Sequence, residues 1–153
     1  MKNNTQFSVG VQILAMAALN PGKHVTSELL ARSVNTNPAL IRRLTGRLKQ
    51  EGLIEIRRGV GCVALCRPPE EITLLDVFRV FSPNPESEPF SLHPNPNPKC
   101  YIGRNIHDAL EMPLAKVNQA MQASLASTTI RDIASFIAVR CGKEANPSNM
   151  QPF

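Results

Sequence analysis

The stretch TSELLARSVNTNPALIRRLTGRLKQEGLIEIRRGVGCVAL, residues 26–65, has the residue types of two capped helices followed by a hairpin. Thr26 and Asn37 are N-cap residue types, and Pro38 follows at the first helical position, where its missing N–H costs nothing. The pattern predicts a helix over 27–34, a turn at 35–36 and a second helix over 38–50. Two helices joined by a tight turn and followed by a wing form a recognised arrangement for placing one helix in a DNA groove.

The second predicted helix has an apolar stripe and a basic outer face. The stripe contains Leu40, Ile41, Leu44 and Leu48. Helical angle places Ala39, Arg42, Arg43, Gly46, Lys49 and Gln50 opposite it, with Thr45 and Arg47 on the flanks. Such a basic face is most often only a solvated surface. Gly46 favours contact with a partner, because an exposed glycine inside a helix costs about 1 kcal/mol relative to alanine and allows close approach to the backbone.

The hairpin is predicted from two short β-prone runs, 53–57 and 62–66, and from the glycine-containing turn between them at 58–61. In the second run Val63 and Leu65 alternate to one side, which we expect to be the core. Cys62 and Cys66 are therefore expected to face outward. They cannot bond to each other, since four residues along a strand span about 13 Å.

The charge of the chain is concentrated in this region. The formal net charge is +5, and six basic residues against two acidic ones fall between Arg42 and Arg58. This clustering favours a polyanionic partner. The chain has no apolar run long enough for a bilayer and no signal-peptide layout at its N-terminus, so we expect a cytoplasmic protein without a membrane partner. Its four cysteines are then expected to be thiols, metal ligands or redox sensors, not a disulfide framework.

The remaining chain supplies supporting elements. A helix over 7–19 precedes the quoted stretch, with the small Gly10 allowing close packing. Thr73 and Asp76 have capping-box spacing and open a helix that reaches about Phe81. We divide the chain into four parts. A winged helix-turn-helix domain covers 1–81, and a proline-rich loop that is a possible sensor covers 82–101. A dimerisation helix with a C-terminal helix covers 102–142, and a disordered tail covers 143–153.

A long helix after the proline-rich loop carries one apolar stripe: Ile106, Leu110, Leu114, Val117, Met121 and Leu125. Pro113 is expected to kink this helix. The stripe either packs back on its own domain or forms a dimer seam. We favour the dimer, because two-fold pairing also presents two recognition helices to DNA. Thr129 and Asp132 repeat the capping-box spacing and open a last helix ending near Cys141.

Several blocks in this order resemble one family: FSVGVQILAMAAL, TSELLARSVNTNPALIRRLTGRLKQEGLIEIRRGVGCVALCRPPEEITLLDVF, CYIGRNI and STTIRDIA. They are similar to the Rrf-two (Rrf2) family of bacterial winged-helix transcription regulators, which includes IscR- and NsrR-like proteins. The resemblance covers roughly residues 7–140. It implies a mainly α fold with a small β wing, and a homodimer that uses a long helix to pair and binds a palindromic operator. It also implies that Arg42 and Arg43 belong to the recognition helix, and Arg57, Arg58 and Gly59 to the wing.

The chain departs from the family in its cysteines. Cluster-binding members carry three cysteines in the loop before the dimerisation helix, whereas this chain has only Cys100 there, with His93 and His107 as the nearest other ligands. Iron–sulfur clusters usually need four protein ligands, so we expect no cofactor and no metal. In the wing, Cys62 and Val63 replace the family's usual glycine and tyrosine.

The leading hypothesis is a DNA-binding transcription regulator, a repressor, that binds double-stranded DNA as a homodimer. Arg42 is expected to read bases, Arg43 to read bases or hold phosphate, and the other basic residues mainly to hold phosphate. The predicted contacts are Thr36, Asn37, Ala39, Arg42, Arg43, Arg47, Lys49, Arg57, Arg58 and Gly59. The alternatives are an iron–sulfur-dependent regulator, and a winged helix that binds protein without binding DNA. The effector, whether small molecule or protein, is not specified by the sequence.

Thiol sensing is a second hypothesis. Cys100 lies in the proline-rich loop, and Arg104 together with a nearby helix N-terminus is expected to lower its pKa. Cys62 is the other candidate. The alternative is that these cysteines are inert small hydrophobes.

An enzyme is not expected. The chain has no Cys-x-x-Cys motif, no phosphate-binding loop and no nucleophile pattern of recognisable spacing. Its three histidines, His24, His93 and His107, are scattered, and we expect them to be surface or capping residues.

Overall fold

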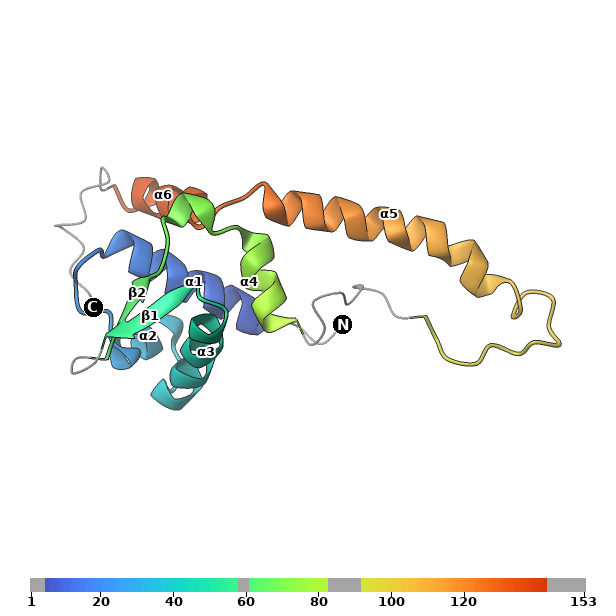
Figure 1. The fold of residues 1–153 in the computed structure, drawn as a ribbon, viewed down its shortest axis with the longest axis horizontal. Coiled ribbons are helices and arrows are strands. Elements are labelled where there is room, and N and C mark those ends of the chain that lie inside the picture. Colours follow the sequence, from blue (N-terminus) through green and yellow to red (C-terminus); the bar gives the residue numbers. More distant parts are fainter. Residues whose placement is uncertain (1–4, 58–60, 83–91, 143–153) are drawn as a thin grey trace.

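The structure is a computed structural model that describes residues 5–57, 61–82 and 92–142. Its elements follow the chain in this order: α1 (Thr5–Leu19), α2 (Ser27–Val34), α3 (Pro38–Gln50), β1 (Ile54–Arg57), β2 (Cys62–Leu65), the 3-10 turn η1 (Pro69–Glu71), α4 (Leu74–Phe81), α5 (Ile106–Ala126) and α6 (Ile130–Arg140). Figure 1 shows a globular head from which α5 projects. The predicted fold class, mainly α with a small β wing on a winged helix-turn-helix, is confirmed.

The helix-turn-helix has the boundaries that its capping residues predict. The Thr26 side chain accepts a hydrogen bond from the backbone N–H of Leu29 at 3.2 Å, and the Asn37 side chain accepts one from Leu40 at 2.8 Å. Asn35 ends α2 in the left-handed region at φ 57°. These local bonds satisfy the first N–H groups of each helix and fix the angle at which α3 leaves the turn.

The wing is an antiparallel pair in which Arg57 lies opposite Cys62 and Ile54 opposite Leu65. Its turn at 58–60 lies outside the described residues. The expectation that Cys62 faces outward is wrong, because Cys62 and Val63 are both buried. The segment before α2 runs along the other edge of β2, where the Val63 N–H donates to the Val25 carbonyl at 2.9 Å, and His24 of this segment lies against Cys62. Cys66 is exposed, as expected.

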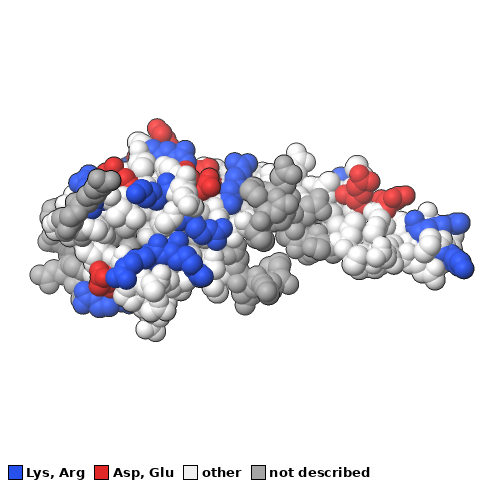
Figure 2. All heavy atoms as spheres, turned by 60° about the horizontal axis from the view of Figure 1, so that its bottom comes forward, with Lys and Arg blue, Asp and Glu red and all other residues white. Residues whose placement is uncertain are grey.

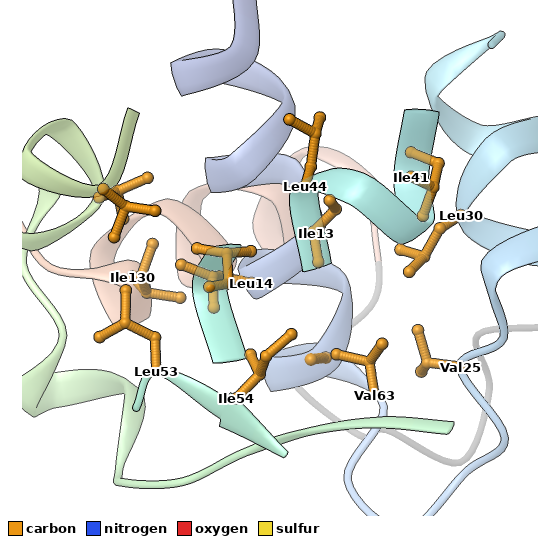
Figure 3. Close-up of a cluster of buried hydrophobic side chains, with 14 of the residues drawn as sticks. Ile13, Leu14, Val25, Leu30, Ile41, Leu44, Leu53, Ile54, Val63 and Ile130 are labelled. Carbon is orange, nitrogen blue, oxygen red and sulfur yellow. The ribbon is translucent and has the colours of Figure 1, made fainter. Parts of the chain in front are cut away.

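The core of the head is built around α1. Figure 3 shows Ile13 and Leu14 of α1 among side chains from α2, α3, the wing and α6, including Ile41, Leu53 and Ile130. The backbone of α1 also approaches α4 closely. A Cβ atom added to Gly10 would lie 2.2 Å from the Phe81 ring, which confirms that a small residue is needed there.

The C-terminal helix α6 belongs to the same core. Thr73 and Thr129 form an isolated bridge, and the Ile130 N–H donates to the Ile72 carbonyl at 2.8 Å. Both predicted capping boxes are present, at the starts of α4 and α6. Although the sequence grouped α6 with the long helix, its residue Ile130 is fully buried with α1 and α4.

The long helix α5 runs without interruption through Pro113, and none of its residues is buried. The predicted stripe is half-buried except at Val117, which is 44 % exposed. No helix in the described part of the chain is both long and apolar enough to span a membrane. The head is therefore packed, whereas the stripe of α5 is left without full cover from its own chain.

Candidate nucleic-acid interface

The outer side of α3 carries the basic residues expected there. Ala39, Arg42, Arg43 and Lys49 are exposed, whereas Ile41, Leu44 and Leu48 are fully buried. Figure 2 brings the lower side of Figure 1, where α2 and α3 lie, toward the viewer and shows a band of Lys and Arg side chains across the head. The helix thus has its apolar stripe in the core and presents a cationic surface to solvent.

Thr45 does not lie on the flank of this surface, as helical angle suggested. It is buried, and its hydroxyl donates to the carbonyls of Ile41 at 3.0 Å and Arg42 at 3.1 Å. These bonds within the helix satisfy the hydroxyl, so Thr45 can pack in the core.

Arg42 is joined to the first helix of the motif. Its guanidinium lies 2.9 Å from the Glu28 carboxylate, and both side chains are 62 % exposed. The backbone N–H of Glu28 itself, followed by Arg42, lowers the pKa of the Glu28 carboxyl. Solvent screens exposed ion pairs, which contribute little to stability, so Arg42 can leave Glu28 when a stronger anion approaches. Glu28 and Arg42 are 14 positions apart on different helices, so helical spacing could not indicate this pair.

Arg43 and Lys49 have a different environment from Arg42. Within the described part of the chain, no hydrogen bond or ion pair holds either side chain. Between them Gly46 faces open space, because a Cβ atom added there would have no neighbour within 4 Å. Packing within this chain therefore does not require a glycine at this position.

Arg47 points into the head. Its guanidinium donates to the side-chain oxygen of Gln6 at 3.1 Å and to the carbonyl of Val80, and lies 5.1 Å from the centre of the Phe81 ring. The residue therefore joins α3 to α1 and α4. It does not lie with the other predicted DNA contacts.

The turn and the wing place the remaining predicted contacts at either side of α3. Thr36 is half-buried, Asn37 is exposed, and the side chain of Asn37 is occupied by the helix cap. Arg57 is exposed at the end of β1 and lies 3.2 Å from the Glu55 carboxylate. Arg58 and Gly59 lie outside the described residues.

Cys100 is exposed in the turns before α5. Hydrogen bonds from the backbone N–H of Gly103, and then of Ile102, lower the pKa of its thiol. The expected causes were Arg104 and a nearby helix N-terminus. The Arg104 guanidinium lies over the Tyr101 ring instead, 5.7 Å from the ring centre, and the two N–H groups belong to the turns that precede α5. The direction of the predicted shift is confirmed and its cause is different.

The residues before α5 do not fit an iron–sulfur cluster. His107 Nε2 lies 3.1 Å from the His93 carbonyl oxygen, and the two rings contact edge to face. Across the described ranges, no three His, Cys, Asp or Glu side chains stand close enough to hold a metal ion. A cluster needs about four protein ligands, which these residues do not supply.

Comparison with known proteins identifies the family. The sequence profile of the Rrf2 family, described as iron-dependent transcriptional regulators, matches residues 3–135. YwnA of Bacillus subtilis (strain 168), whose name assigns it provisionally to the HTH-type transcriptional regulators, is 35 % identical over 134 residues, which cover 88 % of this chain and 98 % of YwnA.

Solved structures show the same fold. CymR (YrzC), the global cysteine regulator of B. subtilis, superposes with a TM-score of 0.68 at 23 % identity, covering 89 % of this chain and 98 % of CymR. The IscR protein of T. potens superposes with a TM-score of 0.63 at 21 % identity, covering 99 % of this chain and 93 % of IscR. The chain therefore belongs to the Rrf2 family of DNA-binding transcriptional regulators, which are not enzymes.

Proposed function

We propose that this Rrf2-family regulator is a homodimeric repressor that places one α3 helix of each protomer in the major groove of a near-palindromic operator. The observation that carries the proposal is the outward cationic face of α3, whose opposite side is fixed in the core. A rigid helix presents its side chains with defined geometry, which base reading requires.

Arg42 and Arg43 are the proposed base readers. Arginine pairs bidentately with guanine, and each such contact is worth about 1–3 kcal/mol of discrimination. The open space at Gly46, between Arg43 and Lys49, supports close approach of the DNA to the helix backbone. Lys49 and Arg57, with Arg58 and Gly59 of the wing, are proposed phosphate contacts. Thr36, Asn37 and Ala39 are proposed to lie near the sugar–phosphate backbone where α3 begins.

Pairing through α5 supplies the two-fold symmetry. Its stripe, from Ile106 to Leu125, faces a second copy in this proposal. Two recognition helices of a dimer contact half-sites about 34 Å apart, one turn of DNA, so the operator is expected to be a near-palindrome.

Thiol oxidation is the proposed signal, and no cofactor is required for it. Cys100 is exposed and its lowered pKa favours the thiolate, which is the reactive form. Cys62 lies at the base of the wing, where a modification would change the DNA-binding surface directly.

The test is binding of DNA from upstream of the regulator's own gene by purified dithiothreitol-reduced protein. We expect the double variant R42A/R43A to lose at least tenfold in affinity at physiological salt, with a shallower dependence on salt. R140A, which removes an exposed arginine from α6, is the matched control and should bind normally. Equal binding by the double variant and the wild type would contradict the assignment. If neither the wild type nor the double variant bound DNA, the result would favour a winged helix that binds protein.

A further inference from the structure

A cavity of about 260 Å³ lies at the base of the wing, behind β2. The end of α1, the loop to α2 and the strand β2 enclose it. Ala17, Ala18 and Leu65 give it an apolar lining, and Cys62 forms part of its wall. A water molecule occupies about 30 Å³ of liquid, so the space suits a group the size of one amino acid.

The mouth of this wing-base cavity is cationic. Lys23, Arg57 and Arg67 line it, and no acidic side chain among the described residues does. Arg57 and Arg67 each have a carboxylate neighbour: Arg57 lies 3.2 Å from Glu55, and Arg67 lies 3.9 Å from Asp76. The Arg57–Glu55 pair is exposed and the Arg67–Asp76 contact is long, so a ligand that carries carboxylates can compete for these guanidiniums.

The thiol in the wall has a basic neighbour. His24 Nδ1 lies 3.0 Å from Cys62 Sγ. The imidazole is exposed, while Cys62 is only 5 % exposed. A thiol within hydrogen-bond reach of an imidazole can be activated as a nucleophile, because the ring nitrogen accepts its proton.

From these three features we propose that Cys62 is a thiol–disulfide exchange site for small disulfides whose thiol halves carry carboxylates. This inference rests on the proposed function only for its effect on DNA. The cationic mouth selects the charge of the disulfide, the cavity holds one half of it, and His24 activates the thiol.

The reaction balances without a further oxidant. The Cys62 proton moves to His24 Nδ1, and the thiolate attacks one sulfur of the bound disulfide. The S–S bond of the disulfide breaks as the bond between Cys62 Sγ and that sulfur forms. The other half leaves as a thiolate and takes the proton from His24. Cys62 is oxidised to a mixed disulfide, and the departing half is reduced to a thiol.

The adduct acts on the wing. Cys62 lies opposite Arg57 in the strand pair, and Arg57 both lines the cavity and is a proposed phosphate contact. A carboxylate held in the cavity competes with DNA phosphate for Arg57. The adduct also fills space against β2, so we expect modification to weaken operator binding at least tenfold.

The experiment uses full-length protein in which Cys66, Cys100 and Cys141 are replaced by serine. It is incubated with three disulfides of similar size: anionic dithiodipropionate, neutral hydroxyethyl disulfide and cationic cystamine. Intact mass and peptide mapping follow adduct formation at Cys62. We expect the anionic probe to react about tenfold faster than the neutral one, and the cationic probe to react slowest.

Two variants test the parts of the site while keeping the thiol. K23Q/R67Q, which changes no proposed DNA contact and keeps only Arg57 of the three cations, should reduce the charge preference, and H24N should slow all three probes. Thermal unfolding of each variant shows that its fold is intact. An unmodified Cys62, or equal rates with the three probes, would overturn the proposal even if the reduced protein binds DNA normally. Adduct formation without DNA binding by the reduced protein would instead contradict the proposed function.

Discussion

Three arginines of α3 have three different environments. Arg42 forms an exposed pair with Glu28, Arg43 is held by no described neighbour, and Arg47 contacts α1 and α4. Arginine therefore packs within the head at position 47, and at positions 42 and 43 it is exposed where we propose DNA recognition. Substitutions of these residues should divide into those that change DNA affinity and those that change stability.

Arg47→Ala is expected to lower the free energy of unfolding by about 1–3 kcal/mol. It leaves a half-buried carbonyl at Val80 without its donor and removes the cation–π contact with Phe81. Urea denaturation measures the loss, with Lys49→Ala on the exposed side of α3 as the control that should stay within about 0.5 kcal/mol. A normally stable Arg47→Ala protein with weakened DNA binding would show that Arg47 contacts DNA.

Gly46→Ala should change stability and DNA binding in opposite directions. The open space around Gly46 can accept a methyl group, and alanine raises helix stability by up to about 1 kcal/mol. If DNA approaches the backbone here, the methyl group obstructs it and affinity falls several-fold. Denaturation and DNA titration of the same sample separate the two effects. A stabilised variant with unchanged affinity would remove Gly46 from the proposed interface.

Residue positions were predictable where they follow from local spacing. The capped ends of α2 and α3 and the exposed side of α3 follow from residues a few positions apart. The roles of Arg47 and Cys62 depend on partners far along the chain, at Val80 and His24, so helical angle and strand alternation could not place them.

At the scale of elements, the capping box of α6 makes stability depend on pH. The Asp132 carboxylate accepts hydrogen bonds from the backbone N–H of Thr129 at 2.8 Å and from its hydroxyl at 2.7 Å. The backbone bond, followed by the hydroxyl, lowers the pKa of Asp132 below its ordinary 3.8. A lowered folded-state pKa means that the carboxylate stabilises the fold above the unfolded-state pKa, and that this contribution is lost as pH falls through the folded-state pKa.

Asp132→Asn is therefore expected to be less stable than the wild type at neutral pH. The difference should shrink as pH falls below about 4, where the wild-type carboxylate becomes protonated. Thermal unfolding between neutral and acid pH measures it. Asp108→Asn, in the first turn of α5 outside any capping box, is the control. A gap between Asp132→Asn and wild type that stays constant with pH would contradict this account.

At the scale of the whole molecule, α5 is a long helix of which no residue is buried by its own chain. Val117 is 44 % exposed and Met112 is 66 % exposed, in a helix that projects from the head. Hydrophobic spacing predicted the helix, but it could not decide between packing on its own head and pairing with a second copy, because both give the same stripe.

Val117→Glu/Met121→Glu should shift the protein from dimer to monomer. Charges placed in an apolar seam are costly to bury, and a monomer contacts only one half-site. Sedimentation measures the mass, and a DNA titration should show more than tenfold weaker binding with about half the salt dependence. Gln119→Glu, on another side of α5, is the control. A double variant that remains dimeric would place the seam elsewhere.

The bridge between Thr73 and Thr129 has a consequence for the entropy of the chain. It joins Thr73 and Thr129, and between these two residues the chain leaves the head after α4 and returns to it along α5. The entropy of closing a flexible loop grows only with the logarithm of its length, and each doubling costs about 0.6 kcal/mol. Residues added between these two points would therefore raise the entropy cost of docking α6 only slowly with their number, so the bridge constrains the length of the chain between them very little.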